Sequence, residues 1–514
     1  MRKALIFPTL LILLTFLLAP AGAGPMFTTT VTEVSDTSAF VGCTADDVDG
    51  QTGTNFLHSE VEPWIDVNPV DNDNIVGIWQ QDRWSNGGAR GLVAGVSFNG
   101  GTSWQEVMIP GISLCSGGIY DRATDPWVSF SPDGTLHQLA LSFNDVAPPF
   151  EEGPGGDFDH ALLASKSTDG GLTWSSPVEV IRDLDANVFN DKQTITADPH
   201  DSNYVYGVWD RLIFPPSERA SIIAGFRTAA FRGPAWFART TDGGETWEPA
   251  RLIYDPGQNS QTIGNQIAVL PDGDLVNLFT LIKFSRGAIR TGEFFTAALL
   301  RSEDRGVTWG PRARSGKIEP IRISPMRTIG VTDPDTGEPH RVGDIIPDIA
   351  VDMTSGKLYA VWQDARFNNM QADAIAFSQS TDGGFTWSAP VKLNATPTDI
   401  PMENQQAWTA SVHVADDGNV GVTYYDFRNN TPGGGTDTDH WLVHCHANCT
   451  NPLNWSENHV DGPFDSRRAP VAGGFFLGDY VGLDNVGNAF TPFFTQTTAT
   501  DPANEYYTEV SPSP

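Results

Sequence analysis

The chain has 514 residues, with 63 acidic and 31 basic side chains and a formal net charge of −32. This charge excludes nucleic acid and anionic membrane surfaces as partners, because both would be repelled. The length exceeds that of an ordinary single domain, but a closed repeat architecture escapes this limit because each unit adds its own part of the core.

The N-terminus is typical of a secretory signal peptide. Arg2 and Lys3 precede an apolar run, Ala4–Leu18, and then a group of small residues. The run is too short for a comfortable membrane span. We therefore expect residues 1–23 to be removed and residues 24–514 to form one exported domain, a monomer that is secreted or periplasmic.

A recurring pattern of four short strands follows. Each set opens with an apolar strand, and five such openings begin at Pro63, Pro126, Gln193, Gln266 and Pro347. A turn rich in Pro, Asp and Gly often comes next, then a second strand that often ends in an aromatic and polar residues. Two further strands complete the set. This pattern predicts an all-β fold, a β-propeller built from four-stranded antiparallel blades.

One octapeptide occurs five times between the predicted third and fourth strands. Its copies end at Trp104, Trp174, Trp247, Trp309 and Trp387. We expect the carboxylates to accept backbone N–H groups of a tight turn and the closing Trp to pack on a neighbouring unit. In the first copy Asn99 replaces the aspartate. The aspartates with this structural role are Asp169, Asp242, Asp304 and Asp382.

Two further sets follow the last octapeptide. Residues 406–414, 420–425 and 440–446 form a sixth set, in which Cys445 to Cys449 occupies the place of the octapeptide. Residues 478–483, 489–495 and 505–510 begin a seventh set that lacks one strand. The alternating N-terminal stretch 27–34 can supply that strand and close the ring. We therefore predict seven blades, with six as the alternative.

The octapeptides resemble the Asp-box, or BNR, repeat of the sialidase superfamily. The resemblance implies a propeller whose boxes are structural, and a glycoside hydrolase of the exo-α-sialidase type that requires no cofactor. The chain departs from the family in two ways. Sialidases have six blades, and their N-terminal Arg-Ile-Pro signature is absent, with only a partial echo at Ile321–Pro325.

Strand order places the functional face opposite the octapeptides. Connections from second to third strands lie on that face, and the long ones span 144–160, 211–234, 283–293 and 428–439. Charged residues at the strand ends are expected there as well, including four Asp–Arg pairs. These pairs are Asp82 with Arg83, Asp210 with Arg211, Asp364 with Arg366, and Asp426 with Arg428.

The resemblance assigns roles to some of these residues. Tyr480 matches the nucleophile, Glu403 its partner and Asp125 the acid. Arginine forks suit a substrate carboxylate, and the candidates are Arg122, Arg211, Arg366 and Arg428, with Arg83 in reserve. The alternative is a non-catalytic propeller that binds glycan or protein, in which each Asp–Arg pair is a salt bridge within its own blade and Tyr480 is a packing residue.

Four cysteines in an exported chain predict two disulfides. We favour Cys43–Cys115 and Cys445–Cys449, and the alternative for the second pair is a zinc cluster with His444 and His446. Two acidic segments, 46–50 and 333–338, have the oxygen-rich spacing of structural calcium loops, and the alternative is that they are solvated loops. We expect no catalytic metal.

Overall fold

The computed structural model describes residues 26–47, 53–144, 159–185, 187–213, 232–284 and 293–512. The predicted signal peptide and most of three long connections therefore lie outside the described residues. The described chain is all-β, as the sequence predicted, and its few helical turns are short. They are η1 (Leu114–Ser116), η3 (Ala365–Asn368), η4 (Met402–Gln405), η5 (Pro452–Asn454) and η6 (Ser466–Arg468). No helix among the described residues is long and apolar enough to cross a membrane.

The strands follow one another in antiparallel groups of four, in which consecutive strands pair. The first two groups are β3 (Glu60–Val67), β4 (Ile75–Arg83), β5 (Ala89–Ser97) and β6 (Gln105–Met108), and β7 (Arg122–Phe130), β8 (Leu136–Phe143), β9 (His160–Ser167) and β10 (Val178–Asp183). The next two are β11 (Val188–Ala197), β12 (Val205–Ile213), β14 (Ala235–Thr240) and β15 (Arg251–Tyr254), and β16 (Ser260–Val269), β17 (Leu275–Phe284), β18 (Glu293–Ser302) and β19 (Ile321–Met326).

The C-terminal half continues the pattern. Its groups are β22 (Asp348–Val351), β23 (Leu358–Asp364), β24 (Ala374–Ser380) and β25 (Val391–Lys392), and β26 (Ala407–Val414), β27 (Val420–Asp426), β28 (Asp437–Cys445) and β29 (Ser456–Asp465). Short strands lie between the groups: β13 (Arg232–Gly233), β20 (Val331–Thr332), β21 (Pro339–Arg341) and β30 (Phe475–Phe476). Among these, β21 pairs with β30 in parallel and joins two distant insertions.

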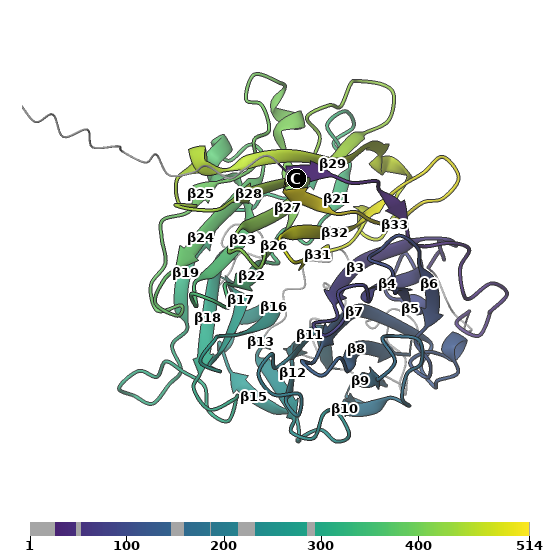
Figure 1. Ribbon diagram of the computed structural model, residues 1–514, viewed down its shortest axis with the longest axis vertical. Helices are drawn as coiled ribbons and strands as arrows, with labels where there is room; N and C mark the ends of the chain where they lie inside the picture. Colours follow the sequence, from purple (N-terminus) through teal and green to yellow (C-terminus); the bar gives the residue numbers. More distant parts are fainter. Residues whose placement is uncertain are drawn as a thin grey trace, which may run out of the picture.

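The last sheet combines both ends of the described chain. It contains β31 (Gly482–Val486), β32 (Ala489–Gln496), β33 (Asn504–Tyr507) and β34 (Val510–Pro512). The N-terminal strands β1 (Met26–Thr28) and β2 (Thr32–Glu33) pair with β34 and β33. In Figure 1 the purple N-terminal strands accordingly lie beside the yellow C-terminal ones.

The first strand of each group lies toward a common centre. Figure 1 shows β3, β7, β11, β16, β22, β26 and β31 innermost. Each of these strands contacts the first strand of the next group, and β31 contacts β3. Hydrophobic side chains lie on both faces of the sheets, and they are buried where neighbouring groups pack against each other.

The octapeptides form the expected turns between third and fourth strands. In the last copy Asp382 accepts hydrogen bonds from the Thr386 backbone N–H at 2.9 Å and from its hydroxyl at 2.6 Å. The closing Trp387 donates from Nε1 to the Gly384 carbonyl at 3.0 Å. In the copy that ends at Trp309, the closing tryptophan packs on the preceding group of strands, and its ring centroid lies 5.5 Å from that of Phe237. The turns therefore lock neighbouring groups together.

We expect Asp382→Ala to lower the free energy of unfolding by about 1 kcal/mol, because the turn loses a carboxylate that caps two donors. Denaturant titration would measure the change. Asp399→Ala is the matched control. Because Asp399 is exposed, this substitution should change the free energy of unfolding by less than about 0.5 kcal/mol. Equal midpoints for the two variants would contradict a locking role for the turn.

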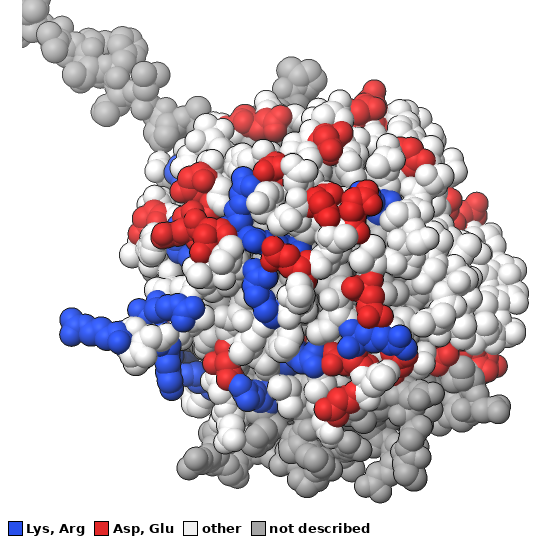
Figure 2. Space-filling view, turned by 90° about the horizontal axis from the view of Figure 1, so that it is seen from below, with Lys and Arg blue, Asp and Glu red and all other residues white. Residues whose placement is uncertain are grey.

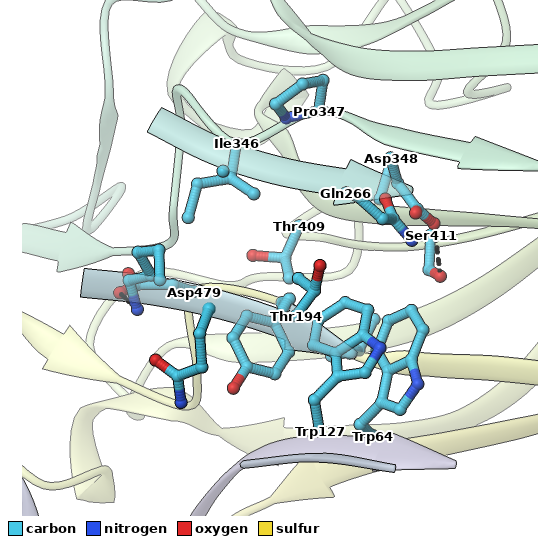
Figure 3. A pocket seen from close by; sticks show the side chains of 16 residues that line it. Trp64, Trp127, Thr194, Gln266, Ile346, Pro347, Asp348, Thr409, Ser411 and Asp479 are labelled. Atoms are coloured by element: carbon cyan, nitrogen blue, oxygen red, sulfur yellow. Dashed lines mark hydrogen bonds and ion pairs between the residues drawn. The ribbon is translucent and has the colours of Figure 1, made fainter. Parts of the chain in front are cut away.

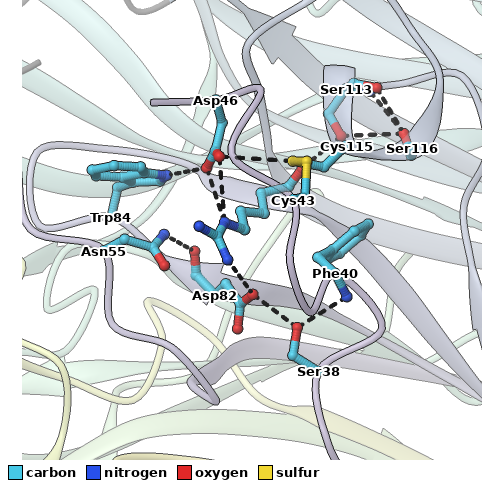
Figure 4. Close-up of a disulfide and its surroundings, with 11 residues drawn as sticks. Ser38, Phe40, Cys43, Asp46, Asn55, Asp82, Trp84, Ser113, Cys115 and Ser116 are labelled. Carbon is cyan, nitrogen blue, oxygen red and sulfur yellow. Dashed lines mark hydrogen bonds and ion pairs between the residues drawn. A yellow bond between two sulfur atoms is a disulfide. The ribbon is translucent and has the colours of Figure 1, made fainter. Parts of the chain in front are cut away.

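Both favoured disulfides are present. Cys43 and Cys115 join the N-terminal segment to η1, beside the buried Asp46 (Figure 4). Cys445 and Cys449 close the turn that replaces an octapeptide. With both sulfurs of that turn in a disulfide, no thiolate remains there for zinc, and the alternative of a zinc cluster at this turn is wrong.

Candidate functional site

The innermost strands share a local distortion. The pairing of β3, β7, β11, β16 and β26 with their neighbours shifts register near the start of each strand, as at a β-bulge. The bulged residues have positive φ, and they are Glu62 (57°), Asp125 (52°), Lys192 (50°), Thr409 (46°) and Gly264 (65°). Four of these residues are not glycine, and such strain is concentrated at functional sites.

Three carboxylates surround one ammonium group at this level. The Nζ of Lys192 lies 2.9 Å from Glu62 Oε1, 2.5 Å from Asp125 Oδ1 and 2.8 Å from Asp479 Oδ2. The guanidinium of Arg341 forks onto Asp479, donating from Nε to Oδ1 at 3.1 Å. We call Glu62, Asp125, Lys192, Arg341 and Asp479 the axial cluster. The cluster is largely buried, but the Lys192 and Arg341 side chains remain 10% and 16% exposed.

Burial gives the members of the axial cluster different proton affinities. It raises the pKa of Glu62 to about 8, and Lys192 offsets only part of this rise. Burial also raises the pKa of Asp479, but Arg341 and Lys192 outweigh it and hold that pKa well below its ordinary value. Glu62 is therefore a proton donor at neutral pH beside an ionised carboxylate.

A small cavity lies behind the axial cluster. Its volume is about 40 Å³, enough for a few water molecules. Figure 3 shows Trp64 and Trp127 lying against each other on one side, with ring centroids 3.5 Å apart. Asp479 lies at one end and Asp348, hydrogen-bonded to Ser411 at 2.8 Å, at the other. Trp64 and Trp127 thus form one wall of the cavity.

Two predicted catalytic residues lie at this centre. Asp125 belongs to the axial cluster, and Tyr480 lines the cavity with its ring centroid 5.2 Å from that of Trp127. The Tyr480 hydroxyl donates to the Pro126 carbonyl at 3.1 Å. Burial raises the pKa of Tyr480 well above its ordinary value, and the nearby carboxylates raise it further. This hydroxyl therefore keeps its proton.

The third predicted catalytic residue lies elsewhere. Glu403 is exposed on η4 and lines a separate cavity of about 460 Å³ together with Arg428, Asn430 and Asp335. Its carboxylate has no hydrogen-bond or ion-pair partner among the described residues, and Tyr480 does not line its cavity. The structure does not bring Glu403 to the axial cluster.

The predicted arginines do not converge on Tyr480. Arg211 forks onto Asp183 and Arg366 onto Asp364. Arg428 binds Asp426 at 2.7 Å and Glu457 at 2.7 Å. Arg122 donates to the Asn86 side chain at 2.9 Å and lies over the Trp84 ring.

Arg83 is the one predicted arginine near the axial cluster. It is buried, donates to the Gly88 carbonyl at 2.6 Å and lies over Phe476, the ring that Arg341 also covers. Burial, together with the nearby charge of Arg341, lowers the pKa of Arg83 to about 10.

Two of the four Asp–Arg salt bridges that the sequence suggested are wrong. Asp364 with Arg366 and Asp426 with Arg428 do pair, because the aspartate ends a strand and caps the following turn. Asp210 instead binds Thr262, Asn265 and the Gly264 backbone N–H.

Asp82 binds Arg90 at 3.5 Å instead of its neighbour Arg83. Adjacent residues in a strand point to opposite faces, so neither Asp82 with Arg83 nor Asp210 with Arg211 can pair. Arg211 and Arg83 are consequently free to make the other contacts described above.

Sequence reasoning missed Glu62 and Arg341 and did not assign roles to Lys192 or Asp479. A signal for two axial positions was present, because Glu62-Pro-Trp and Asp125-Pro-Trp repeat one acidic tripeptide at the start of successive first strands. Proline fits a bulge, where no ladder hydrogen bond is needed. Arg341 has no such signal, since it belongs to an insertion between groups.

Protein side chains bind aspartates in both acidic segments that suggested calcium, and residues 48–50 of the first segment lie outside the described residues. Asp46 receives Trp84 Nε1 at 2.7 Å and Arg90 at 3.3 Å. Asp333 binds Arg467, which also reaches Asp335 at 3.1 Å. Burial raises the pKa of Asp333, but these donors outweigh it and hold the pKa well below its ordinary value. Calcium binding at these segments remains a prediction.

No protein-family model matches the chain, and no curated protein matches it. Solved structures similar to it include a protein of unknown function from Dyadobacter fermentans, with 14% identity, a TM-score of 0.44 and coverage of 94% of this chain and 99% of that chain. The Hadza microbial sialidase Hz136 shares 14% identity at a TM-score of 0.46, over 85% of this chain and 73% of its own.

The α-L-arabinofuranosidase Arb93A from Fusarium graminearum shares 11% identity at a TM-score of 0.42, over 90% of this chain and 98% of its own. Because each of these TM-scores is below 0.5, the likenesses carry no argument about this chain.

Proposed function

We propose that this chain is an exported, closed seven-bladed β-propeller that hydrolyses a glycosidic bond at the axial cluster. The seven groups of strands, the contacts between successive first strands and the pairing of both chain ends support the blade count and the closure. The octapeptides support membership of the Asp-box repeat proteins. Two disulfides fit an oxidising compartment, secreted or periplasmic.

The observation that carries the function is the convergence of the Glu62, Asp125 and Asp479 carboxyl groups on Lys192, where burial raises the pKa of Glu62 to about 8. Glu62 Oε1 and Asp125 Oδ1 lie 2.9 and 2.5 Å from the same Lys192 Nζ, so these oxygens are at most 5.4 Å apart. Retaining glycosidases hold their two carboxyl groups about 5–5.5 Å apart, and inverting enzymes hold them farther apart. This upper bound lies below the roughly 6.5–9.5 Å of inverting enzymes, so the proposal takes retention of configuration.

We assign the roles from the positions of the carboxyl groups around Lys192 and from the raised pKa of Glu62. Glu62 donates its proton to the leaving oxygen, Asp125 attacks the anomeric carbon, and Glu62 then takes a proton from the water that releases the sugar. Lys192 offsets the charge of Asp125, and Arg341 holds Asp479 in place. We assign Tyr480 a packing role, because its pKa is raised and its hydroxyl is bound to a carbonyl.

The surroundings of Glu62 support its protonated form. Gln80 Oε1 is buried without a hydrogen-bond partner among the described residues, while Gln80 Nε2 lies against Glu62 Oε2. The two ends of an amide are assigned from their hydrogen bonds. Turning the Gln80 amide over gives its oxygen a partner when Glu62 carries a proton on Oε2.

Turnover of aryl glycosides tests the proposal. The panel includes the α-sialoside that the Asp boxes suggest and the α-L-arabinofuranoside, with pH varied from 4 to 8. We expect release of the aryl group with the anomeric configuration retained in the first-formed sugar, observed by NMR. Asp125→Asn should abolish this release, whereas Asp399→Asn, at an exposed position, should not. Inversion, or equal turnover by the two variants, would refute the assigned roles.

A second candidate is a non-catalytic glycan-binding propeller. The observation that favours it is that Arg211, Arg366 and Arg428 are each held by carboxylates and do not converge on a substrate carboxylate. Binding on a glycan array without any release across the panel would favour this candidate.

A further inference from the structure

The cations of this acidic chain are distributed unevenly. Most arginines in the described ranges are buried or ion-paired, as Arg211, Arg366 and Arg428 are. Seven exposed Lys and Arg side chains have no carboxylate partner within 4.0 Å among the described residues. They are Lys283, Arg312, Arg314, Lys317, Arg322, Arg327 and Lys357.

Five of the seven lie within one short stretch, residues 312–327, which we call the cationic strip. It comprises the connection that leads into β19 and β19 itself, the outer strand of its group. Arg312 and Arg322 lie on the connection and the strand, and Arg327 follows directly after the strand. Figure 2 shows Lys and Arg side chains gathered toward the left of the face that it presents.

The strip combines a short hairpin with a strand, because Arg312 bridges Ile318 and the Ala313 N–H donates to the Lys317 carbonyl, whereas Arg322 lies on β19. A strand rises about 3.3 Å per residue, so the segment from Arg322 to Arg327 alone extends over roughly 16 Å. No large hydrophobic side chain between Arg312 and Arg327 is among the exposed ones, but Phe294 on the paired strand β18 is exposed, next to the Phe295–Met326 pair. A stable protein interface needs an apolar core, and a single exposed ring does not supply one.

Protection of an exposed strand edge is the ordinary reason for charge on an outer strand. That reason does not require cations in a chain of net charge −32. On the outer strand β10 the cation is ion-paired, because Arg182 binds Asp159, and on β25 Lys392 is only partly exposed and donates to Asn368 at 3.3 Å. The exposed, unpaired cations of the strip therefore need a separate explanation.

We propose that the cationic strip binds an acidic polysaccharide chain. Charges attract over only about 8–10 Å at physiological ionic strength, so the strip acts locally despite the net charge of the molecule. Exposed cations on the hairpin and on the adjoining strand suit a polymer that repeats carboxylate or sulfate groups along its chain. The choice of a polysaccharide rests on the proposed function, and the strip would hold the protein on a polymer whose bonds the axial cluster cleaves.

Binding to alginate, a carboxylated polysaccharide, tests the proposal, with uncharged dextran as the reference. We expect the intact protein to bind alginate at low salt, to release it as salt rises, and to ignore dextran. Replacing Arg312, Arg314 and Lys317 with Gln should weaken binding about tenfold. Arg322→Gln with Arg327→Gln forms an independent second variant that should do the same. Lys357→Gln is the matched control, because this exposed, unpaired cation lies outside the strip.

Unchanged alginate affinity in both strip variants, with thermal unfolding like that of the parent, would overturn the proposal. Equal or tighter binding of double-stranded DNA would overturn the choice of a polysaccharide. Aryl glycoside turnover, measured on the same samples, should be unaffected by the strip variants. That second measurement separates failure of the strip from failure of the axial site.

Discussion

Glu62→Gln is expected to lower kcat/KM for the cleaved glycoside on the order of a thousandfold, because the amide cannot donate the proton that the leaving oxygen needs. The variant keeps the shape of the side chain and the contact with Gln80. The loss should therefore appear mainly in kcat. Steady-state kinetics on the aryl glycoside that the parent protein cleaves best would measure it.

The pH profile gives an independent readout of the same residue. Glu62 must be protonated to act as an acid, so activity should fall as pH rises through about 8, where burial places its pKa. In Glu62→Gln the remaining activity should lose this alkaline limb. An aryl group of low pKa leaves without acid assistance, so such a substrate should lose much less rate in the variant.

A matched control separates chemistry from charge. Glu245→Gln removes a largely exposed carboxylate that binds Lys166 in an octapeptide turn, so its kinetics should match those of the parent. Equal loss in the two glutamine variants, or an alkaline limb that persists in Glu62→Gln, would contradict the assignment of Glu62 as the acid.

Stability should follow the same titration. The folded state raises the pKa of Glu62 from its ordinary value of 4.5 to about 8, so the folded protein holds this proton more tightly than the unfolded chain does. Its contribution to stability is complete below about pH 4.5 and is lost as pH rises to about 8. The thermal midpoint of Glu62→Gln should depend less on pH in that window.

The octapeptide turns and the short disulfide could be predicted from the sequence because the residues that form them are close together in the chain. The hydrogen bonds of the octapeptide turn join residues four apart, so those between Asp382 and Thr386 could be predicted from the spacing of the two residues. The disulfide between Cys445 and Cys449 is predictable for the same reason. Strand order then predicted a functional face opposite the turns, and the bulges near the starts of the first strands lie at that end of the strands.

The site was harder to predict because its residues meet only through ring closure. Lys192 gathers carboxylates from β3 and β7 and from the segment before β31, which are far apart in the chain. The sequence predicted Asp125 as the acid, whereas our proposal makes it the nucleophile. Too many Asp–Arg pairs were predicted because adjacent strand residues such as Asp210 and Arg211 point to opposite faces and bind different partners.

Lys192→Met should destabilise the protein by about 3–5 kcal/mol, the usual cost of leaving buried charges without their partner. The substitution leaves the Asp125 and Asp479 carboxylates facing each other beside the protonated Glu62, with only Arg341 bound to Asp479. Like charges at this separation repel strongly where water is excluded. Denaturant titration near neutral pH would measure the loss.

The matched control is Lys166→Met. Lys166 pairs with Glu245, whose side chain is 71% exposed, so its loss should cost at most about 1 kcal/mol. A cost for Lys192→Met no larger than that of the control would show that Lys192 does not hold the axial cluster together.

Removing one carboxylate should restore part of the loss. In the double variant Lys192→Met with Asp125→Asn, one repelling charge is gone, and the two substitutions should be less costly together than their sum. Lowering the pH should act in the same direction, because protonation of the carboxylates replaces the missing ammonium. Full additivity at neutral pH together with an equal cost at pH 4 would mean that the bulges alone set the geometry, whereas coupling would show that Lys192 is what allows three acidic side chains to share one centre.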